Sequence, residues 1–407
     1  MIQEPNIGSV IGAEEIEALS ALLTARTESL SWGHEIAAFE QDFARMCGAE
    51  HAMAVSSGTA ALDLCAQALQ FEPGDEIVAT PFSFWSTISA QVARGVRIRF
   101  ADVEPDTMNI DARTIAALMT PRTKAIYLVH YGGNPADLDA VRAVADAHGV
   151  PIVEDCCHAP GARYQGRAIG AGDLCCFSFH SYKNMTTLGE GGMVTTSNPL
   201  LARRIRDLRS IGILADGERR ESTAFGPYRK PDFDLNDHSK GSWDVDLLRV
   251  DAIGSNFRMT AAAAAVGRVQ LRKLNAMNAA RTSVAERYDE ALGALGLRTL
   301  SVRPGDRSAW HLYTCFLPPE LGVDRNRLLR YVQEKHDLSI ILRYWPLHLN
   351  SIMRSKGHAF GEAPECERVW FEQLINLPIG PLISDALVDR IVHAIADGLR
   401  QCRAAAA

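Results

Sequence analysis

The strongest constraint on the fold is a regular alternation of short apolar segments with amphipathic ones between residues 51 and 156. Strands that alternate with helices in this way predict a mostly parallel sheet covered by helices. The apolar segments lack a strict two-residue alternation, which is typical of strands buried on both faces. The expected strands are 51–56, 76–80, 96–102, 124–130 and 151–156, and the expected helices are 58–69, 83–93, 111–119 and 138–148.

The chain beyond residue 156 is less regular. Two more strands, joined by a Gly-rich turn, are expected at 173–179 and 192–196. A long helix is expected from Thr260 to Leu292, where apolar residues recur with helical spacing. The region after it mixes both kinds of element. Its expected strands are 311–317 and 338–342, and its expected helices lie near 324–335 and 384–401.

The length of 407 residues is too great for one small core, so we expect two domains in an α/β fold. The large domain is expected over residues 1–260 and includes an N-terminal helical segment at 13–48. The linking helix and a small C-terminal α/β domain are expected over 261–407. Residues 213–245 are polar, with several Gly and Pro residues, and predict a long excursion from the large domain.

The formal net charge of −7 argues against a nucleic-acid-binding protein, because such proteins usually carry a basic face. No run of about eighteen apolar residues is present, so no membrane-spanning helix is expected. The acidic N-terminal stretch lacks the basic and apolar regions of a signal peptide, and the nine cysteines lack the spacing of a disulfide scaffold. We therefore expect a cytoplasmic protein with reduced cysteines.

Residues 56–59 read Ser-Ser-Gly-Thr and stand between an expected strand and an expected helix. Free N–H groups at a helix N-terminus, a glycine that permits close approach and neighbouring hydroxyl groups form a cradle for an anion such as phosphate. Ser57, Gly58 and Thr59 are its candidate contacts. The same residues also suit an ordinary helix cap, where Ser and Thr are preferred, so both interpretations stay open.

Asp155 lies near the end of the expected strand 151–156, where α/β sheets present catalytic groups. A buried carboxylate is costly unless a cation meets it, and a pyridinium nitrogen is one such cation. A helix cap or a buried ion pair is the alternative. Cys156, Cys157 and His158 raise the further alternative of a metal site. No spaced ligand set such as Cys-x-x-Cys accompanies them, so no metal is expected.

Lys183 is unusual among the seven lysines of the chain, because it alone follows an apolar strand and precedes a Gly-rich turn. In such a place a neutral amine can attack a carbonyl group and form a Schiff base. A surface lysine on a turn is the alternative interpretation. Residues 256–260, Asn-Phe-Arg-Met-Thr, are by themselves a helix-cap region with one arginine.

Taken in order, these motifs resemble the DegT/DnrJ/EryC1/StrS aminotransferases, and the resemblance covers nearly the whole chain. That family makes amino sugars and aminocyclitols with pyridoxal 5′-phosphate (PLP). The resemblance implies the fold-type-I scaffold, with a large, mostly parallel seven-stranded-type sheet and a smaller C-terminal domain. It rests on LSWGHEIAAFE (30–40), SSGTAAL (56–62), TPFSFWST (80–87), VHYGGNPADLDAV (129–141), EDCCHAPGA (154–162), FSFHSYKNMTTLGEGG (177–192), SNFRMT (255–260), YWPLHL (344–349) and LINLPI (374–379).

The resemblance implies a role in catalysis or cofactor binding for several candidates. Lys183 is the Schiff-base lysine and moves the proton of the 1,3-transfer, and Asp155 pairs with the pyridine nitrogen. His158 stands near the 3-oxygen of the cofactor. Phe84 falls at the aromatic position that stacks on the pyridine ring. The phosphate-binding positions are Gly58, Thr59 and Ser178.

Four further residues concern the partner subunit and the substrate. Asn256 matches a residue that reaches the phosphate of the neighbouring subunit, which implies a homodimer with shared active sites. Trp32, Tyr344 and His348 are candidate substrate contacts.

The implied reaction is a ping-pong transamination. Glutamate or glutamine converts PLP to pyridoxamine 5′-phosphate, which then aminates a keto-sugar, expected to be nucleotide-linked, or a keto-cyclitol. A branch of the family replaces the lysine with His and removes a sugar hydroxyl instead, so Lys183 favours transamination. A PLP-dependent dehydratase or lyase and a non-catalytic regulator on the same fold are the alternatives. No nucleic acid or membrane is expected as a partner.

Two departures from the family pattern concern the acceptor. Leu188 is inserted into the usual Thr-Thr-Gly-Glu-Gly-Gly sequence, and the excursion at 213–245 is longer than expected. Both are expected where the substrate and the partner subunit approach. The acceptor could therefore also be a cyclitol ketone or an unlinked keto compound.

Overall fold

The centre of the structure is a seven-stranded sheet in the order β1-β9-β8-β5-β4-β2-β3. Neighbouring strands are parallel except where β9 pairs with β1 and β8. The predicted mostly parallel sheet is therefore confirmed. The computed structural model describes residues 2–3, 5, 7–25, 29–212 and 252–404. The strands are β1 (His51–Val55), β2 (Glu76–Ala79), β3 (Arg97–Phe100), β4 (Thr123–Val129), β5 (Ile152–Asp155), β8 (Leu174–Ser178) and β9 (Gly192–Thr196).

Helices cover both faces of this sheet, because successive side chains of a strand point to opposite faces and both sets are apolar. One face packs against α3, α4 and α7. The opposite face packs against α2 and the first half of α9 at one end, and against α5 and α6 at the other. The helices are α1 (Ala13–Ala25), α2 (His34–Cys47), α3 (Gly58–Ala68), α4 (Ser86–Ala93), α5 (Ala112–Leu118), α6 (Leu138–His148), α7 (Pro199–Leu208) and α9 (Ala261–Ala294).

Local sequence explains where several of these helices begin and end. The side chains of Ser57, Asp137 and Thr260 accept hydrogen bonds from backbone N–H groups in the first turns of α3, α6 and α9. Gly48 and Gly149 end α2 and α6 in the left-handed conformation, which glycine adopts without a steric penalty. The helix α3 thus begins directly at the predicted cradle.

A second core lies around the three-stranded sheet β10-β11-β12 and contains the C-terminal half of α9. The expected strand 338–342 was wrong. Within the described residues, only Leu338 of this segment pairs, in an isolated bridge with Ile2, while β11 takes residues 374–377 as its other neighbour. The elements of this region are β10 (Arg298–Thr299), β11 (Tyr313–Phe316), β12 (Leu374–Leu377), α10 (Arg325–His336), α11 (Ser351–Ser355), α12 (Pro364–Arg368) and α13 (Asp385–Ala404).

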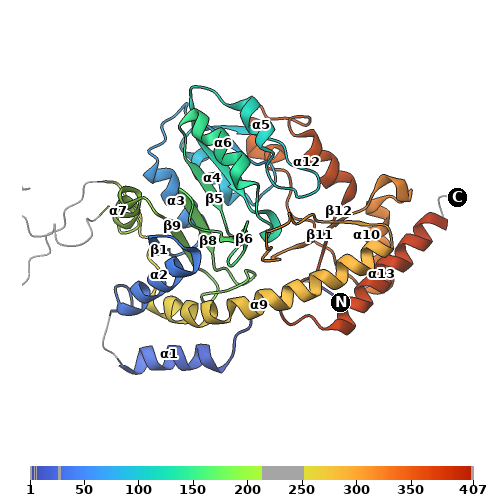
Figure 1. Cartoon of the computed structure of the whole chain (residues 1–407), viewed down its shortest axis with the longest axis horizontal. Coiled ribbons are helices and arrows are strands. Elements are labelled where there is room, and N and C mark those ends of the chain that lie inside the picture. Colours follow the sequence, from blue (N-terminus) through green and yellow to red (C-terminus); the bar gives the residue numbers. More distant parts are fainter. Residues whose placement is uncertain (1, 4, 6, 26–28, 213–251, 405–407) are drawn as a thin grey trace, which may run out of the picture.

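The long helix α9 runs along the molecule and contributes to both cores (Figure 1). Its start at Ala261 agrees with the expected linking helix, whereas the division into domains at residue 260 stays a prediction. The expected excursion at 213–245 lies outside the described residues. No helix in the described ranges is long and apolar enough to cross a membrane.

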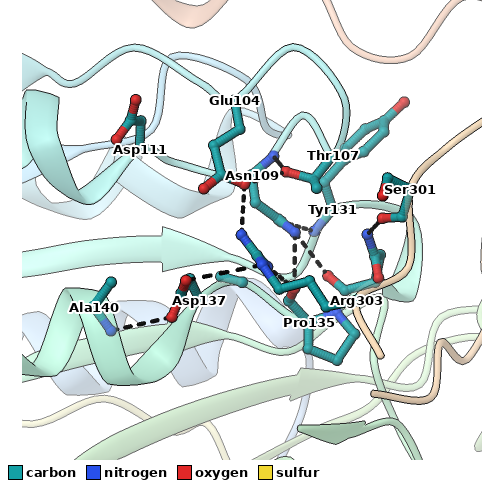
Figure 2. Close-up of polar contacts among 12 residues, drawn as sticks. Glu104, Thr107, Asn109, Asp111, Tyr131, Pro135, Asp137, Ala140, Ser301 and Arg303 are labelled. Carbon is teal, nitrogen blue, oxygen red and sulfur yellow. Dashed lines mark hydrogen bonds and ion pairs between the residues drawn. The ribbon is translucent and has the colours of Figure 1, made fainter. Parts of the chain in front are cut away.

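A polar network ties the C-terminal region to the loops after β3 and β4 (Figure 2). Arg303 donates to Glu104 at 2.6 Å and to the carbonyl of Pro135 at 3.4 Å. Asn109 donates to the same carbonyl at 3.0 Å, and the side chain of Asn134 donates to the carbonyl of Ser301 at 2.8 Å. These bonds fix the chain at 301–303 against the large sheet region.

Candidate active site

The predicted cradle meets the carboxyl ends of β5 and β8. Gly58, the first residue of α3, lies so close to the last residue of β8 that a Cβ atom on it would stand 2.7 Å from the Ser178 Cβ atom and 3.1 Å from the Cys157 Sγ atom. Only glycine permits this approach. It brings the N-terminus of α3, Ser178 and the segment after Asp155 together.

The cradle presents unpaired N–H groups in the first turn of α3. The Ser57 hydroxyl is used as a cap, because it accepts a hydrogen bond from the Ala60 N–H group at 3.1 Å. Thr59 is exposed, and its hydroxyl lies 2.8 Å from the Ser86 hydroxyl. The two interpretations are therefore compatible. The Ser57 side chain caps the helix, and the remaining backbone N–H groups can hold an anion.

Asp155 is 5% exposed and lies on the face of the sheet that α4 covers. Its carboxylate accepts hydrogen bonds from the Thr87 hydroxyl at 2.7 Å and from the Cys157 N–H group at 3.1 Å. No Lys, Arg or His side chain of the described residues pairs with it. A buried carboxylate with two neutral donors and no cation is suited to meet a cationic ligand group.

His158 follows Asp155 by three residues and is buried, and its Nε2 atom lies 3.2 Å from the Tyr344 hydroxyl. Its Nδ1 atom is buried without a partner in the described part of the chain. Burial, followed by the positive charge of Lys183, lowers the pKa of His158 well below its usual value. The ring is therefore neutral near pH 7 and has one nitrogen left for a ligand.

Lys183 lies in the turn after β8 and is half-buried. Its N–H group donates to the His180 carbonyl at 2.9 Å. Its charge also lowers the pKa of the Cys157 thiol, against the larger raising effect of burial, and lowers the pKa values of His158 and His311. The charge of Lys183 therefore acts on two buried histidines and one partly buried thiol.

Two aromatic residues continue the cluster. The Tyr344 ring is nearly parallel to the His158 ring, at 5.6 Å and 11°. Phe84 is 57% exposed and meets Tyr344 edge to face, with ring centroids 5.9 Å apart. The structure thus brings Phe84, His158 and Tyr344, from three distant parts of the sequence, to one place.

Comparison with known proteins decides the family of this chain. The model of the DegT/DnrJ/EryC1/StrS aminotransferase family matches residues 9–396. The chain belongs to this family. The spore coat polysaccharide biosynthesis protein SpsC of Bacillus subtilis (strain 168) is 35% identical over 392 residues, which cover 95% of each chain.

Solved structures of aminotransferases share the fold over almost the whole length. The aminotransferase TlmJ from Streptoalloteichus hindustanus has a TM-score of 0.83 and 32% identity, and the match covers 98% of this chain and 99% of TlmJ. DesV of S. venezuelae has a TM-score of 0.82 and 29% identity with the same coverage. The chain is therefore an aminotransferase of a PLP-dependent family, with the fold of its relatives.

The clustered residues fit PLP. The N-terminus of α3 with Ser178 offers donors for a phosphate. Asp155 offers a carboxylate without a cationic partner, which suits a protonated pyridine nitrogen. His158 has an unpartnered buried nitrogen, and Lys183 supplies an amine. Each polar part of this aminotransferase's expected cofactor therefore has a counterpart of suitable chemistry.

The structure does not bring the three suggested metal ligands to one point. Cys156, Cys157 and His158 do not form one ligand set. The Cys157 thiol approaches the Cys176 carbonyl at 3.8 Å, and His158 bonds to Tyr344. Cys156 instead lies near two other residues, His130 and Glu154.

Within the described residues, no hydrogen bond or ring contact joins three predicted residues to this cluster. Trp32 is exposed, and the Arg258 guanidinium group stands 4.8 Å from its ring centroid, in a cavity of about 690 Å³ that none of the cofactor candidates lines. Asn256 is exposed and pairs through its backbone with Ser210. Their roles stay predictions. His348 is fully buried.

The expected substrate contact of His348 has no support in the structure. The His348 Nε2 atom lies 2.7 Å from the Glu367 carboxylate, and both side chains are almost inaccessible. Its ring also meets Phe100 at 5.7 Å. His348 is thus enclosed by the chain, with its Nδ1 atom unpartnered within the described residues, and its role as a substrate contact stays a prediction.

Sequence reasoning missed Thr87, Asn184 and His311. Thr87 was noted only as part of an expected helix and of the motif at 80–87, with no role of its own, and His311 only as the first residue of an expected strand. Asn184 directly follows Lys183, and a buried amide at that position is a signal that could have been followed. Its partners are 94 and 127 residues away, so the sequence alone could not have named them.

Proposed function

We propose that this aminotransferase moves an amino group from glutamate or glutamine to a keto-sugar or keto-cyclitol, with PLP held on Lys183. The observation that carries the proposal is the environment of Asp155: it is buried, has two hydrogen-bond donors and has no cationic partner in the described residues. Such a carboxylate would keep a pyridine nitrogen protonated. When bound, PLP supplies the electron sink that transamination requires.

Different residues of the site bind the cofactor, orient it and transfer the proton. The N–H groups of α3 and the Ser178 hydroxyl hold the phosphate. Asp155 holds the proton on the ring nitrogen, and neutral His158 orients the cofactor through its free nitrogen. The Nζ atom of Lys183 accepts the proton of the amino donor and returns it. Phe84 and Tyr344 line the side from which the substrate approaches.

The proposed acceptor class follows from relatives. The name of SpsC refers to polysaccharide biosynthesis, which supports a keto-sugar, and the nucleotide-linked form is the first to test. Leu188 is half exposed in the turn after Lys183, on a surface that a substrate or a partner subunit could reach. A keto-cyclitol and an unlinked keto compound therefore belong in the same panel.

We also propose a homodimer with shared active sites. Asn256 is exposed, and its side chain has no hydrogen bond within the described residues. An exposed amide is free to reach the phosphate site of a partner subunit. Sedimentation would show a dimer. Mixing Lys183→Ala with Asn256→Ala protein should restore part of the activity, because one of the two mixed sites would then be intact.

The decisive test is an absorbance spectrum of the PLP-loaded protein, before and after L-glutamate. Wild-type protein should show the visible band of a lysine-bound cofactor, and glutamate should shift it and release 2-oxoglutarate. Lys183→Ala should lose the band and about a millionfold in turnover, an effect typical of removing the covalent catalyst. Lys124→Ala, which removes an exposed lysine on β4, is the control. Retention of the band in Lys183→Ala would refute the proposal.

A further inference from the structure

A buried amide next to Lys183 fixes the orientation of its neighbours. Asn184 is 1% exposed, and its Nδ2 atom donates to the Ala309 carbonyl at 2.6 Å and to the Asn278 Oδ1 atom at 2.9 Å. A backbone carbonyl can only accept, so the Asn184 side chain can take only this orientation. Its Oδ1 atom therefore faces the His311 Nδ1 atom, 3.2 Å away.

This contact determines the tautomer of His311. Because the Asn184 Oδ1 atom can only accept, the His311 Nδ1 atom must carry the hydrogen and donate it. Burial, followed by the charge of Lys183, lowers the pKa of His311 well below its usual value, so the ring is neutral. Its Nε2 atom then bears a lone pair, and no group of the described residues bonds to it.

The His311 ring lies against the His158 ring, with centroids 4.5 Å apart and planes 30° apart. His158 itself has one polar contact, to Tyr344 at 3.2 Å, which lies at the long end of the range for a hydrogen bond. One such contact by itself leaves a ring free to tilt about it. The face of His311 limits that tilt from a shorter distance than the nearly parallel Tyr344 ring, whose centroid is 5.6 Å from that of His158.

A second set of hydrogen bonds connects the segments that carry Lys183 and His158. Asn278, on α9, receives the hydrogen bond from Asn184 and donates through its Nδ2 atom to the Pro160 carbonyl at 2.9 Å. Pro160 lies two residues after His158, and Asn184 lies one residue after Lys183. The segments that carry His158 and Lys183 are thus connected both through His311 and through Asn278.

We propose that His311, oriented by Asn184, is a positioning residue that sets the ring plane of His158 relative to Lys183. The inference rests on the proposed roles of His158 and Lys183 and adds a residue that acts through them. His311 holds His158 by ring contact, while its own position depends on the hydrogen bond to Asn184.

Two variants separate these contributions. His311→Asn keeps a donor near the position of Nδ1 but removes the ring, and His311→Phe keeps a ring but leaves the buried Asn184 Oδ1 atom without a donor. If ring contact positions His158, His311→Asn should lose more turnover, about tenfold or more in kcat with the KM for glutamate within about twofold. His311→Phe should lose more stability, because an unsatisfied buried acceptor is costly.

The measurements are the kcat and KM of the glutamate half-reaction, the midpoint of urea unfolding and the circular dichroism of the visible cofactor band, which reports how the cofactor is held. The band should change most in His311→Asn. The affinity of the apo protein for PLP gives a readout independent of turnover. His336→Asn, which removes a histidine paired with Asp397 near the C-terminus, is the control and should leave the band unchanged.

A purely structural role predicts that loss of kcat follows loss of stability in both variants, and that result would overturn the inference. An unchanged dichroism band in His311→Asn would overturn it as well. Nitrogen-15 spectra of histidine-labelled apo protein should show hydrogen on the Nδ1 atom of His311, and hydrogen on Nε2 instead would contradict the assignment. The proposed function would survive each of these failures, because it depends on the loss of the band in Lys183→Ala.

Discussion

Glu154 and Asp155 are neighbours at the end of β5, and their carboxylates lie on opposite faces of the sheet because strand side chains alternate. Both are almost completely buried, at 3% and 5% exposure. Asp155 faces α4, and Glu154 faces His130, whose Nε2 atom lies 3.1 Å away. Two adjacent acids in equal burial thus have different surroundings.

The difference lies in whether the polar groups are satisfied inside the chain. The Ala136 N–H group donates to the His130 Nδ1 atom at 3.0 Å, so the Nε2 atom carries the hydrogen and donates to Glu154. Both ring nitrogens therefore have partners. Near Asp155, the carboxylate lacks a cation, and the His158 Nδ1 atom lacks a partner in the described residues. The unpartnered Nδ1 atom of His158, next to a carboxylate that has no cationic partner, is what distinguishes the Asp155 face from the Glu154 face.

The largest effect expected from this comparison of the two acids is that of Asp155→Ala on catalysis. Without the carboxylate the ring nitrogen of the cofactor is not held protonated, and we expect kcat/KM to fall about a thousandfold, since lost charge pairs cost about 4 kcal/mol. Folding stability of the apo protein should fall much less than turnover, because the loss of the acceptor for the Thr87 hydroxyl and the Cys157 N–H group is offset by the removal of a buried charge without a cation. Single-turnover rates and urea unfolding measure the two quantities. A large loss of stability with normal turnover would reverse the comparison.

The reverse pattern is expected for Glu154→Leu. Loss of the acceptor leaves the hydrogen on the His130 Nε2 atom buried without a partner, which costs about 2 kcal/mol of unfolding free energy. Turnover per folded molecule should stay within about twofold of wild type. Glu154→Gln is the matched control, because its amide oxygen still accepts and the loss should be smaller. Equal losses in both variants would show that the charge of Glu154 matters, not its acceptor.

Local pattern predicted the residues at the ends of strands and helices, but not those whose role depends on distant contacts. Lys183, Asp155 and Gly58 stand at the ends of expected strands and helices, so pattern and motif predicted where the structure places them. The burial of His348 against Glu367 could not be predicted from the sequence, because Glu367 comes from another segment, and a substrate contact of His348 stays a prediction. The role of Asn184 depends on which distant side chains contact it and on which nitrogen of His311 carries the hydrogen. The local sequence pattern predicts neither.

Residues 338–342 show the same limit for the fold. The segment is apolar and suits a strand, but a strand forms only where another strand is available to pair with it. Residues 374–377 occupy that place beside β11. Sequence pattern thus predicted the large sheet, in which consecutive strands have similar surroundings, better than the small one.

The smallest expected effect concerns pH and again separates the two faces of β5. The pKa values of His158 and His311 are lowered in the folded state, so below about pH 6.5 the unfolded chain binds more protons than the folded one. Stability contributed by these neutral rings is therefore complete above that pH and is lost as the pH falls below it.

Each such histidine adds at most about 1.4 kcal/mol per pH unit to the slope of unfolding free energy. In His158→Phe, urea unfolding of the apo protein between pH 6.5 and 5 should show a slope that is smaller than that of wild type. The double variant with His311→Phe should reduce the slope further, because both sources are removed. Equal slopes in wild type and His158→Phe would mean that His158 does not have to lose a proton on folding. The site would then be open enough to water for the imidazolium form, and the unsatisfied Nδ1 atom would no longer distinguish the Asp155 face from the Glu154 face.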